Sequence, residues 1–433
     1  MIGFDPTESE GEKLRVFDAQ KSLVASNAAD AAGRGLYEFT LEMLFVVTLS
    51  ASAFQMGMLN ALGSVAFVAA TIPAGYLVDR AGAVKILRLG LGAKVALLAS
   101  LLVLDATGTL NIPVALTLAT LMGACNVFGE TSQVSAVPEV DREGHSIGRL
   151  IARLAATDQA LAIVIPAIAG TLFTLFGSVP MLGASLTIAL SALGLAFTLS
   201  RARTSTEYAE KPAPVRPRGN TTVFGGMSYL FGHRSLLALT FATMFCNLGL
   251  AIGSSVEALF VINELELGAQ GYGLYAAVGG VGGLIGAAIS TQLAQRYTPS
   301  QLALPSMLGQ IVFSSCVLLA NYTSREWAIA LLTLHAFGWG IVLLIFNIAI
   351  STWVVEITPE DLLGRVLSAR RLFTFGVVPL GGVVGGFIGT QFGIQAALAA
   401  WVGATCLGLL CFVVLRPRLT ILRDMEPREP VAE

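Results

Sequence analysis

Charged residues are scarce in this sequence. Asp, Glu, Lys and Arg make up 12% of the 433 residues, whereas 55% of them are hydrophobic. Soluble domains carry about 25% charged residues, so this share indicates that lipid surrounds much of the chain. The formal net charge of -2 excludes the strongly basic surface that nucleic-acid binding needs, and no nucleic-acid partner is predicted.

The sequence also lacks a catalytic or metal-binding constellation. Its five cysteines lie inside apolar runs without a C-x-x-C pair, and its three histidines are far apart. Such thiols are typical of packing residues rather than of disulfides or a zinc site. No catalytic residue, metal or cofactor is predicted, and an enzyme is the least favoured class of function. A cleavable signal peptide is not expected, because the first twenty residues are polar and acidic.

Long apolar runs are abundant, and twelve of them approach the length of about twenty residues that spans a bilayer. The fold class predicted is an all-α membrane protein with helices at 22–48, 53–77, 84–105, 111–132, 150–176, 179–200, 236–261, 271–293, 300–320, 326–350, 366–389 and 394–415. The proline-containing polar stretch after the sixth helix is typical of a linker. The expected parts are a segment 1–21, a bundle 22–200, a linker 201–235, a bundle 236–415 and a tail 416–433.

The positions of the basic residues predict the orientation. If the amino terminus is cytoplasmic, all but three of the 26 Lys and Arg residues fall in cytoplasmic segments or in the adjoining helical turns. The exceptions are Arg34, Lys94 and Arg325. Because cytoplasmic loops attract Lys and Arg, both termini of this multi-pass protein are expected in the cytoplasm. The segment 223–233 is expected to form a short helix on the membrane surface.

The two predicted bundles repeat each other at an offset of 216 residues. Gly148-Arg149-Leu-Ile corresponds to Gly364-Arg365-Val-Leu, and TLFTLFG at 171–177 corresponds to FIGTQFG at 387–393. One register that fits several loops and helices predicts two pseudo-symmetric bundles of six helices. Related bundles around a site at the midplane are a transporter architecture.

The loop between the second and third helices carries the most specific motif, GYLVDRAG at 75–82. Gly75 allows close helix contact, and Gly82 permits a sharp reversal into the third helix. Asp79 can face the positive amino-terminal end of a neighbouring helix. Arg80 can reach lipid headgroups or an acidic neighbour.

This motif resembles the loop signature G-x-L-a-D-R-x-G-[RK]-[RK] of the major facilitator superfamily, with Ala83 and Val84 where the family usually has basic residues. The resemblance implies that Asp79 contacts the eleventh helix and holds a cytoplasmic gate closed. The expected gating residues are Gly75, Asp79, Arg80, Gly82, Arg149 and Arg365. The glycine-rich segments 279–286 and 381–386 lack the Lys-Ser/Thr of a phosphate-binding loop, so an ion gradient rather than ATP is expected to drive transport.

Within the superfamily the chain most resembles the macrolide and siderophore exporters of the third drug–proton antiporter group. DAAGRGLYEFTLE at 30–42 matches the first-helix pattern G-D-G-L-Y-Q-F-A-L-P, with Arg34 where Asp is usual. IPAIAG at 165–170 matches a weakened G-P-x-x-G-G. The resemblance implies proton-coupled efflux of a small amphipathic drug, siderophore or metabolite across the plasma (inner) membrane by a monomer.

The first helix carries charges that a lipid-facing helix would exclude, because each costs about 2.5–3.5 kcal/mol at the helix centre. At 100° per residue they share a sector of roughly 140°, formed by Asn27, Asp30, Arg34, Tyr37, Glu38 and Glu42. Arg34 can pair with Asp30 or Glu38 at i,i+4 spacing. Two interpretations stay open, an ion-pair centre that joins helices and a transport path in which Glu38 exchanges a proton.

Further ionisable residues lie in other spans. Lys94 is expected to neutralise an acid of the first bundle, with Asp158 and Glu38 as the candidates, while Glu130 is interpreted as a gating or structural partner. His335 is interpreted as a packing histidine, with a proton relay as the alternative. The expected substrate and proton path comprises Asp30, Arg34, Tyr37, Glu38, Lys94, Asp158 and Glu257.

The expected partners are therefore a small molecule, protons and the lipid bilayer. An uptake permease or a uniporter of the same fold is the first alternative. A non-transporting receptor or scaffold is the second, and a long soluble domain would favour it. An everted-vesicle assay separates export from uptake, because only an exporter accumulates its substrate inside such vesicles.

Overall fold

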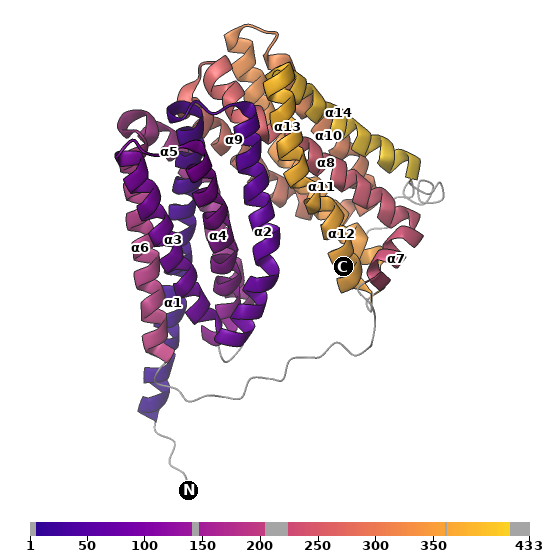
Figure 1. The fold of residues 1–433 in the computed structure, drawn as a ribbon. Helices are drawn as coiled ribbons and strands as arrows, with labels where there is room; N and C mark the ends of the chain where they lie inside the picture. The colour runs from indigo at the N-terminus through magenta and orange to yellow at the C-terminus, as the bar shows by residue number, and fades with distance from the viewer. Residues whose placement is uncertain (1–5, 141–146, 204–223, 360–361, 416–433) are drawn as a thin grey trace. The chain divides into compact units, whose positions relative to one another are not determined.

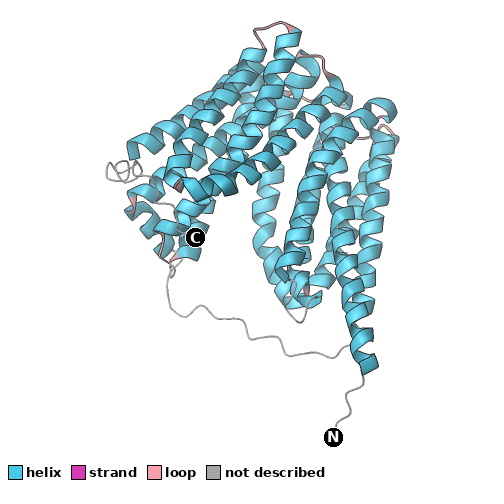
Figure 2. Cartoon of the chain, turned by 180° about the vertical axis from the view of Figure 1, so that it is seen from behind, coloured by secondary structure: helices cyan, strands magenta, loops and turns pink. Residues whose placement is uncertain are grey.

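A computed structural model describes residues 6–140, 147–203, 224–359 and 362–415, which form helices joined by short connections (Figures 1 and 2). No strand occurs in these ranges. Eleven of the helical segments are long and apolar enough to cross a membrane. The predicted fold class is confirmed. Most of the predicted linker and the whole predicted tail lie outside the described residues.

The chain divides into two compact units, and the first contains residues 1–49 and 62–215. Its helices are α1 (Pro6–Met43) with the π-helical turn η1 (Leu44–Thr48), α2 (Ala53–Ala81), α3 (Ala83–Ala106), α4 (Ile112–Val140), α5 (Ile147–Phe176) and α6 (Ser178–Arg203). Helix α1 and η1 take the place of the first predicted span. Three charged residues between positions 31 and 48 make this segment less apolar than the other spans.

The second unit contains residues 50–61, which include the start of α2, and 216–433. Its helices are α7 (Phe224–Gly232), α8 (Arg234–Leu259) with η2 (Phe260–Glu264), α9 (Gly268–Arg296), α10 (Pro299–Ala320), α11 (Arg325–Ile357), α12 (Leu363–Gly376), α13 (Val378–Phe392) and α14 (Ile394–Leu415). The short helix α7 forms within the segment 223–233, where a short helix was expected. The eleventh predicted span is interrupted at Val377, two residues before Pro379, whose nitrogen carries no hydrogen to continue the helical ladder.

The 216-residue repeat is present in the backbone. The π-helical turns begin at Leu44 and Phe260, which are 216 residues apart. Gly177 and Gly393, separated by the same offset, both adopt positive φ angles, of 76° and 90°. The neighbours also correspond: α1 packs on α6 and α5, as α8 packs on α14 and α13. Likewise α3 packs on α4 and α6, as α10 packs on α11 and α14.

Small residues bring α1 close to its neighbours. A Cβ atom at Gly33 would lie 3.5 Å from the carbonyl oxygen of Ser185 on α6, and one at Gly35 would lie 3.2 Å from the Ile165 side chain on α5. The Ser26 hydroxyl donates a 3.0 Å hydrogen bond to the carbonyl of Ala192 on α6. These contacts fix the rotation of α1 about its axis and thereby set where its charged sector points.

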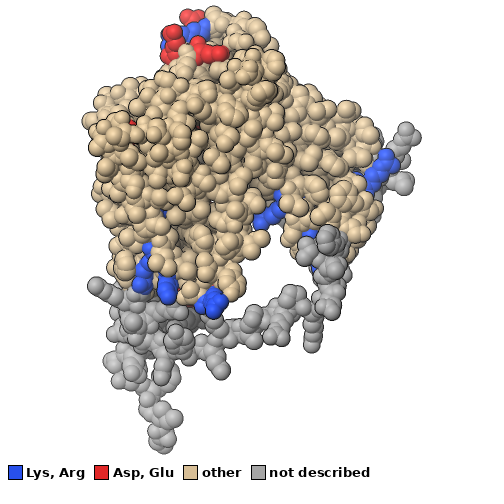
Figure 3. Space-filling model, in the orientation of Figure 1, with Lys and Arg blue, Asp and Glu red and all other residues tan. Residues whose placement is uncertain are grey.

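Much of the visible face of the molecule carries no charged side chain. In the space-filling view, broad areas carry neither basic nor acidic side chains, and Lys and Arg appear mainly near the lower edge (Figure 3). Large apolar side chains such as Ile72, Leu175 and Phe392 are exposed in the structure. Such a surface is stable against lipid tails, which agrees with the low share of charged residues in the sequence.

Candidate functional site

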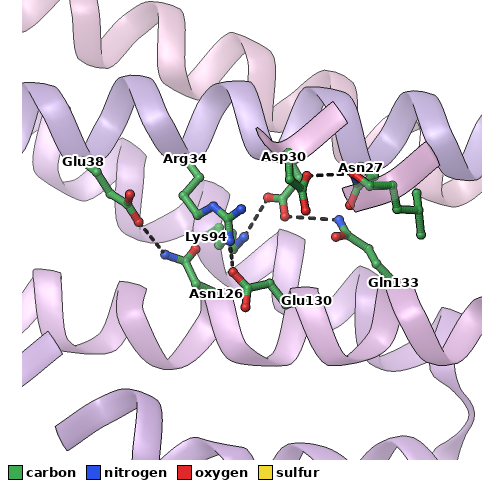
Figure 4. Close-up of polar contacts among 10 residues, drawn as sticks. Asn27, Asp30, Arg34, Glu38, Lys94, Asn126, Glu130 and Gln133 are labelled. Carbon is green, nitrogen blue, oxygen red and sulfur yellow. Dashed lines mark hydrogen bonds and ion pairs between the residues drawn. The ribbon is translucent and has the colours of Figure 1, made fainter. Parts of the chain in front are cut away.

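Polar side chains of four helices meet inside the first unit (Figure 4). Helix α1 packs against α5 and α6, and its charged sector faces α4. The cluster consists of Asn27, Asp30, Arg34 and Glu38 on α1, Lys94 on α3, Asn126, Glu130 and Gln133 on α4, and Asp158 on α5. We call this set the first-unit cluster.

A buried ion pair joins α1 to α3. The Lys94 ammonium donates to Asp30 Oδ1 at 2.7 Å, and the two side chains are 4% and 5% exposed. The Gln133 amide donates to Asp30 Oδ2 at 3.2 Å, so both carboxylate oxygens have a partner. Gly129 leaves room for the pair, because a Cβ atom there would lie 3.3 Å from Lys94 Nζ. The pair is neutral as a whole, which lowers the cost of burying each charge.

Lys94 thus neutralises an acid of the first bundle, as expected, but the acid is Asp30 and the two candidates Asp158 and Glu38 were wrong. Sequence spacing along one helix does not determine which face of α3 points at α1. Packing of both helices against α6 turns Lys94 towards Asp30 instead.

Arg34 forms its ion pair across helices rather than within α1. Its guanidinium donates to Glu130 Oε1 on α4, and the two side chains are 20% and 45% exposed. The expected i,i+4 ion pairs of Arg34 with Asp30 or Glu38 do not form in the described structure. Helix α4 lies opposite this face of α1, so Glu130 is close enough to pair with Arg34. The structural pairing expected of Glu130 is present.

Two carboxylates of the cluster have amide partners instead of cations. Asn126 donates to Glu38 Oε1 at 3.4 Å, and Asn27 donates to Asp158 Oδ1 at 2.9 Å. Within the described ranges, neither acid has a basic side chain at ion-pair distance. Glu38 is exposed and Asp158 is half-buried. A neutral amide brings no counter-charge of its own, so these two acids differ from Asp30 and Glu130, which each contact a cation.

The other predicted path residues lie elsewhere. Tyr37 is only 4% exposed and packs inside the first unit. Glu257 belongs to the second unit, where the Tyr275 hydroxyl donates to its Oε1 atom. The ring nitrogen Nε2 of His335 lies 3.7 Å from the same oxygen. The predicted path is thus divided between a cluster in each unit.

The loop motif adopts part of its expected geometry. Gly82 has a φ angle of 90° and starts α3, as the expected reversal requires. The Arg80 guanidinium donates to the Tyr76 hydroxyl at 2.9 Å. The expected close helix contact at Gly75 is wrong, because no described atom lies within 4 Å of a Cβ atom built there. Glu139, at the end of α4, accepts the backbone N–H of Ala83 at 3.3 Å and so complements the positive start of α3.

The remaining motif residues lie at helix starts. Arg149 is exposed in the first turn of α5, and Arg365 is half-buried in the first turn of α12. The 216-residue offset relates these two positions, as it relates the helices that carry them. Asp79 is exposed in the last turn of α2.

Sequence reasoning missed three participants, Asn126, Gln133 and Tyr275. The first two were detectable, because Asn126, Glu130 and Gln133 are spaced i, i+4 and i+7 and therefore share one face of α4. Tyr275 gave no such signal. It shares α9 with Tyr272, and only the packing of the helices within the second unit brings it to Glu257 on α8.

Comparisons with known proteins agree with this architecture. The sequence profile described as Major Facilitator Superfamily matches residues 23–375. Among solved structures, the nucleoside transporter NupG is 15% identical with a TM-score of 0.71, covering 92% of this chain and 98% of that one. A bacterial homologue of the iron transporter ferroportin is 15% identical with a TM-score of 0.68, covering 92% and 98%. No curated protein matches the sequence significantly.

A third solved structure is a bacterial homologue of the human lysosomal transporter Spinster. It is 14% identical to this chain with a TM-score of 0.66, and the alignment covers 99% of this chain and all of that one. At such identities the likeness concerns the fold alone. The titles name different cargoes, so the shared fold does not select a substrate.

Proposed function

Because the chain belongs to the major facilitator superfamily, we propose that it is a proton-coupled exporter of a small amphipathic molecule. It would work by alternating access, in which the two units rock about a site near the midplane. The family and fold make the chain a membrane transporter. Proton coupling, export and the class of substrate are the proposed part.

The observation that carries the coupling proposal is the unequal pairing of acids in the first-unit cluster. Asp30 and Glu130 each face a cation, so their charges are compensated without a proton. Glu38 and Asp158 face only amides. A carboxylate with an uncompensated charge inside a membrane gains most from binding a proton. Glu38 is also exposed, so water can deliver that proton.

Arg34 supplies the substrate side of the proposal. It lies one helical turn from Glu38, and its ion pair with Glu130 is partly exposed. An anionic group of the substrate could compete with Glu130 for the guanidinium. Protonation of Glu38 would alter the negative charge beside that site. Binding of substrate and proton would thus be linked through one helix face.

The proposal also includes the orientation in the membrane, the oligomeric state and the cytoplasmic gate. Both termini lie in the cytoplasm of a cell whose plasma membrane holds the protein as a monomer. Asp79, Arg80 and Gly82, together with Arg149 and Arg365, would form the cytoplasmic gate. An uptake permease or uniporter of the same fold remains the main alternative, and a non-transporting receptor is the next.

Everted membrane vesicles test the proposal. A deletion strain is first screened for altered toxin sensitivity, and active compounds or fluorescent amphipathic dyes are then offered to vesicles with an acidic interior. The proposal expects accumulation inside the vesicles that collapses when a protonophore removes the gradient. Accumulation that ignores the gradient would overturn proton coupling, and loss of substrate from the vesicles would support uptake.

Glu38→Gln tests the coupling residue. We expect at least a tenfold loss of gradient-driven transport with unchanged expression and melting temperature, because the amide keeps the shape but binds no proton. Glu326→Gln is the matched control, since Glu326 is an exposed acid at the start of α11. Normal transport with a normal pH profile in Glu38→Gln would remove Glu38 from the mechanism.

A further inference from the structure

A second polar cluster lies within the second unit, formed by Glu257 on α8, Tyr275 on α9 and His335 on α11. Tyr275 donates its hydroxyl hydrogen to Glu257 Oε1, and His335 Nε2 lies 3.7 Å from that oxygen. The histidine side chain is 3% exposed and that of the glutamate 17%. The three helices that carry these groups belong to one unit, so their geometry does not depend on the placement of the other.

One hydrogen bond fixes the histidine tautomer. His335 Nδ1 lies 2.7 Å from the carbonyl oxygen of Phe313 on α10. A carbonyl oxygen can only accept, so Nδ1 carries the hydrogen. In a neutral imidazole Nε2 then bears a lone pair, and it faces the Glu257 carboxylate. Two acceptors that face each other repel, whereas a proton on either of them makes the contact attractive.

The charge balance around the pair also favours one additional proton. The titratable side chains that face it are Tyr275 and, behind Tyr275 at a ring separation of 6.2 Å, Tyr272. Within the described residues, no Lys or Arg lies at ion-pair distance from Glu257. Helix α13 contains no ionisable residue, and Glu264 lies two turns beyond Glu257 on η2. An ionised Glu257 beside a neutral His335 therefore leaves one uncompensated negative charge.

Two tryptophans enclose the imidazole. The ring centroids of Trp339 and Trp401 lie 5.6 Å and 5.3 Å from that of His335. Trp401 packs directly on the backbone of α8, where a Cβ atom at Gly249 would lie 2.9 Å from its indole. These contacts keep water away from the histidine and give the pair an optical reporter.

We propose that Glu257 and His335 together bind one exchangeable proton, carried on Nε2 or on the carboxylate that faces it, and that its uptake and release is a step of the transport cycle. The proton comes from water and forms an N–H or O–H bond, and its release restores the lone pair. This inference rests on the proposed function in one respect only, the link to transport. Proton binding itself is independent of any substrate.

The pH dependence of tryptophan fluorescence in the purified full-length protein tests proton binding. A protonated imidazole quenches a neighbouring indole, so lowering the pH should reduce the emission in a single transition. Trp339→Phe and Trp401→Phe should each remove a large part of its amplitude. His335→Gln should abolish the transition. His233→Gln is the matched control, because that exposed histidine contacts Tyr229 and no tryptophan.

The Glu257→Gln variant distinguishes a proton bound by both groups from protonation of His335 alone. Without the carboxylate the imidazolium loses its counter-charge, so the midpoint should move to lower pH by at least about one unit. An unchanged midpoint, or a transition that survives in His335→Gln, would overturn the proposal. If His335→Gln does not fold, Glu257→Gln and the two Trp→Phe variants decide the question alone.

Transport assays then distinguish the two proposals. A normal titration in a protein whose transport ignores the proton gradient would overturn the proposed function and leave the proton site. Gradient-driven transport that is unaffected by Glu257→Gln would overturn the role of this site and leave the proposed function.

Discussion

The two units bury different chemistry in the same scaffold. At the 216-residue offset, Asp30 and Lys94 of the first unit correspond to Cys246 and Gln310 of the second. All four are buried, but the second pair is neutral. The six-helix scaffold therefore forms without the ion pair, and the charges of the first unit are not required by the fold as such.

The opposite difference is found at the second-unit cluster, which consists of Glu257, Tyr275 and His335. Glu257 and His335 correspond to Leu41 and Ala119 in the first unit, and Trp401 corresponds to Ser185. Each unit thus places these ionisable groups where the other has uncharged residues. The first-unit cluster contains two cations that neutralise two acids, whereas the second-unit cluster contains one acid and a titratable base. The comparison teaches that the repeat determines the architecture, whereas the buried polar groups differ between the halves.

The largest effect is expected from breaking the Asp30–Lys94 pair. Lys94→Gln leaves the Asp30 carboxylate buried without its cation, which should cost about 3–5 kcal/mol. The double variant Asp30→Cys with Lys94→Gln installs the residues of the second unit and should recover much of that loss. Thermal unfolding of the purified variants in detergent measures both. A single variant as stable as the double would contradict the assigned pair.

A smaller loss is expected where Trp401 packs on α8. A Cβ atom at Gly253 would overlap the indole ring, so Gly253→Ala should cost about 1–3 kcal/mol. It should also weaken the pH-dependent fluorescence transition, because the displaced indole moves relative to His335. Gly403→Ala on α14 is the control, since no atom lies within 4 Å of the added carbon. Equal melting temperatures of the two variants would argue against tight packing at this point.

The smallest effect tests the symmetry itself. Gly177 and Gly393 both have positive φ angles, so alanine should cost about 1–2 kcal/mol at either position. Gly183→Ala, in open space within α6, is the reference for a glycine with ordinary helical geometry. Melting temperatures of Gly177→Ala and Gly393→Ala that fall by similar amounts would support equivalent turns. A lower melting temperature at one position alone would show that the two turns are not equivalent.

Helix positions, the repeat and the charged sector of the first helix were predictable from the sequence. Helix positions and the charged sector follow from the periodicity of neighbouring residues, and the repeat follows from the similarity of the two halves of the sequence. The α5 bounds Ile147–Phe176 and the combined bounds Leu363–Phe392 of α12 and α13 keep the 216-residue offset that motif matching predicted. The predicted first span began too late. It was placed where the apolar run starts, whereas α1 begins at Pro6 and includes the polar stretch before that run.

Ion-pair partners were not predictable in the same way. The sequence placed Asp30 and Glu38 within reach of Arg34, yet Glu130 on α4 is the partner. An i,i+4 contact within a helix contributes only about 0.2–0.5 kcal/mol. The structure pairs Arg34 with Glu130 on another helix instead. The rotation of each helix, set by contacts such as those at Gly33 and Gly35, decides which charges meet.

The sequence by itself determined that this chain consists of two related helical bundles with ionisable residues on defined helix faces. Helices that cross lipid need long apolar stretches, and charged side chains within them face the interior of a bundle. Only the tertiary structure decided that Lys94 pairs with Asp30, that Glu38 has an amide rather than an ion-pair partner among the described residues, and that His335 faces Glu257. Those three facts depend on distances between helices that are far apart in the chain. Such distances follow from side-chain packing, which no local pattern encodes.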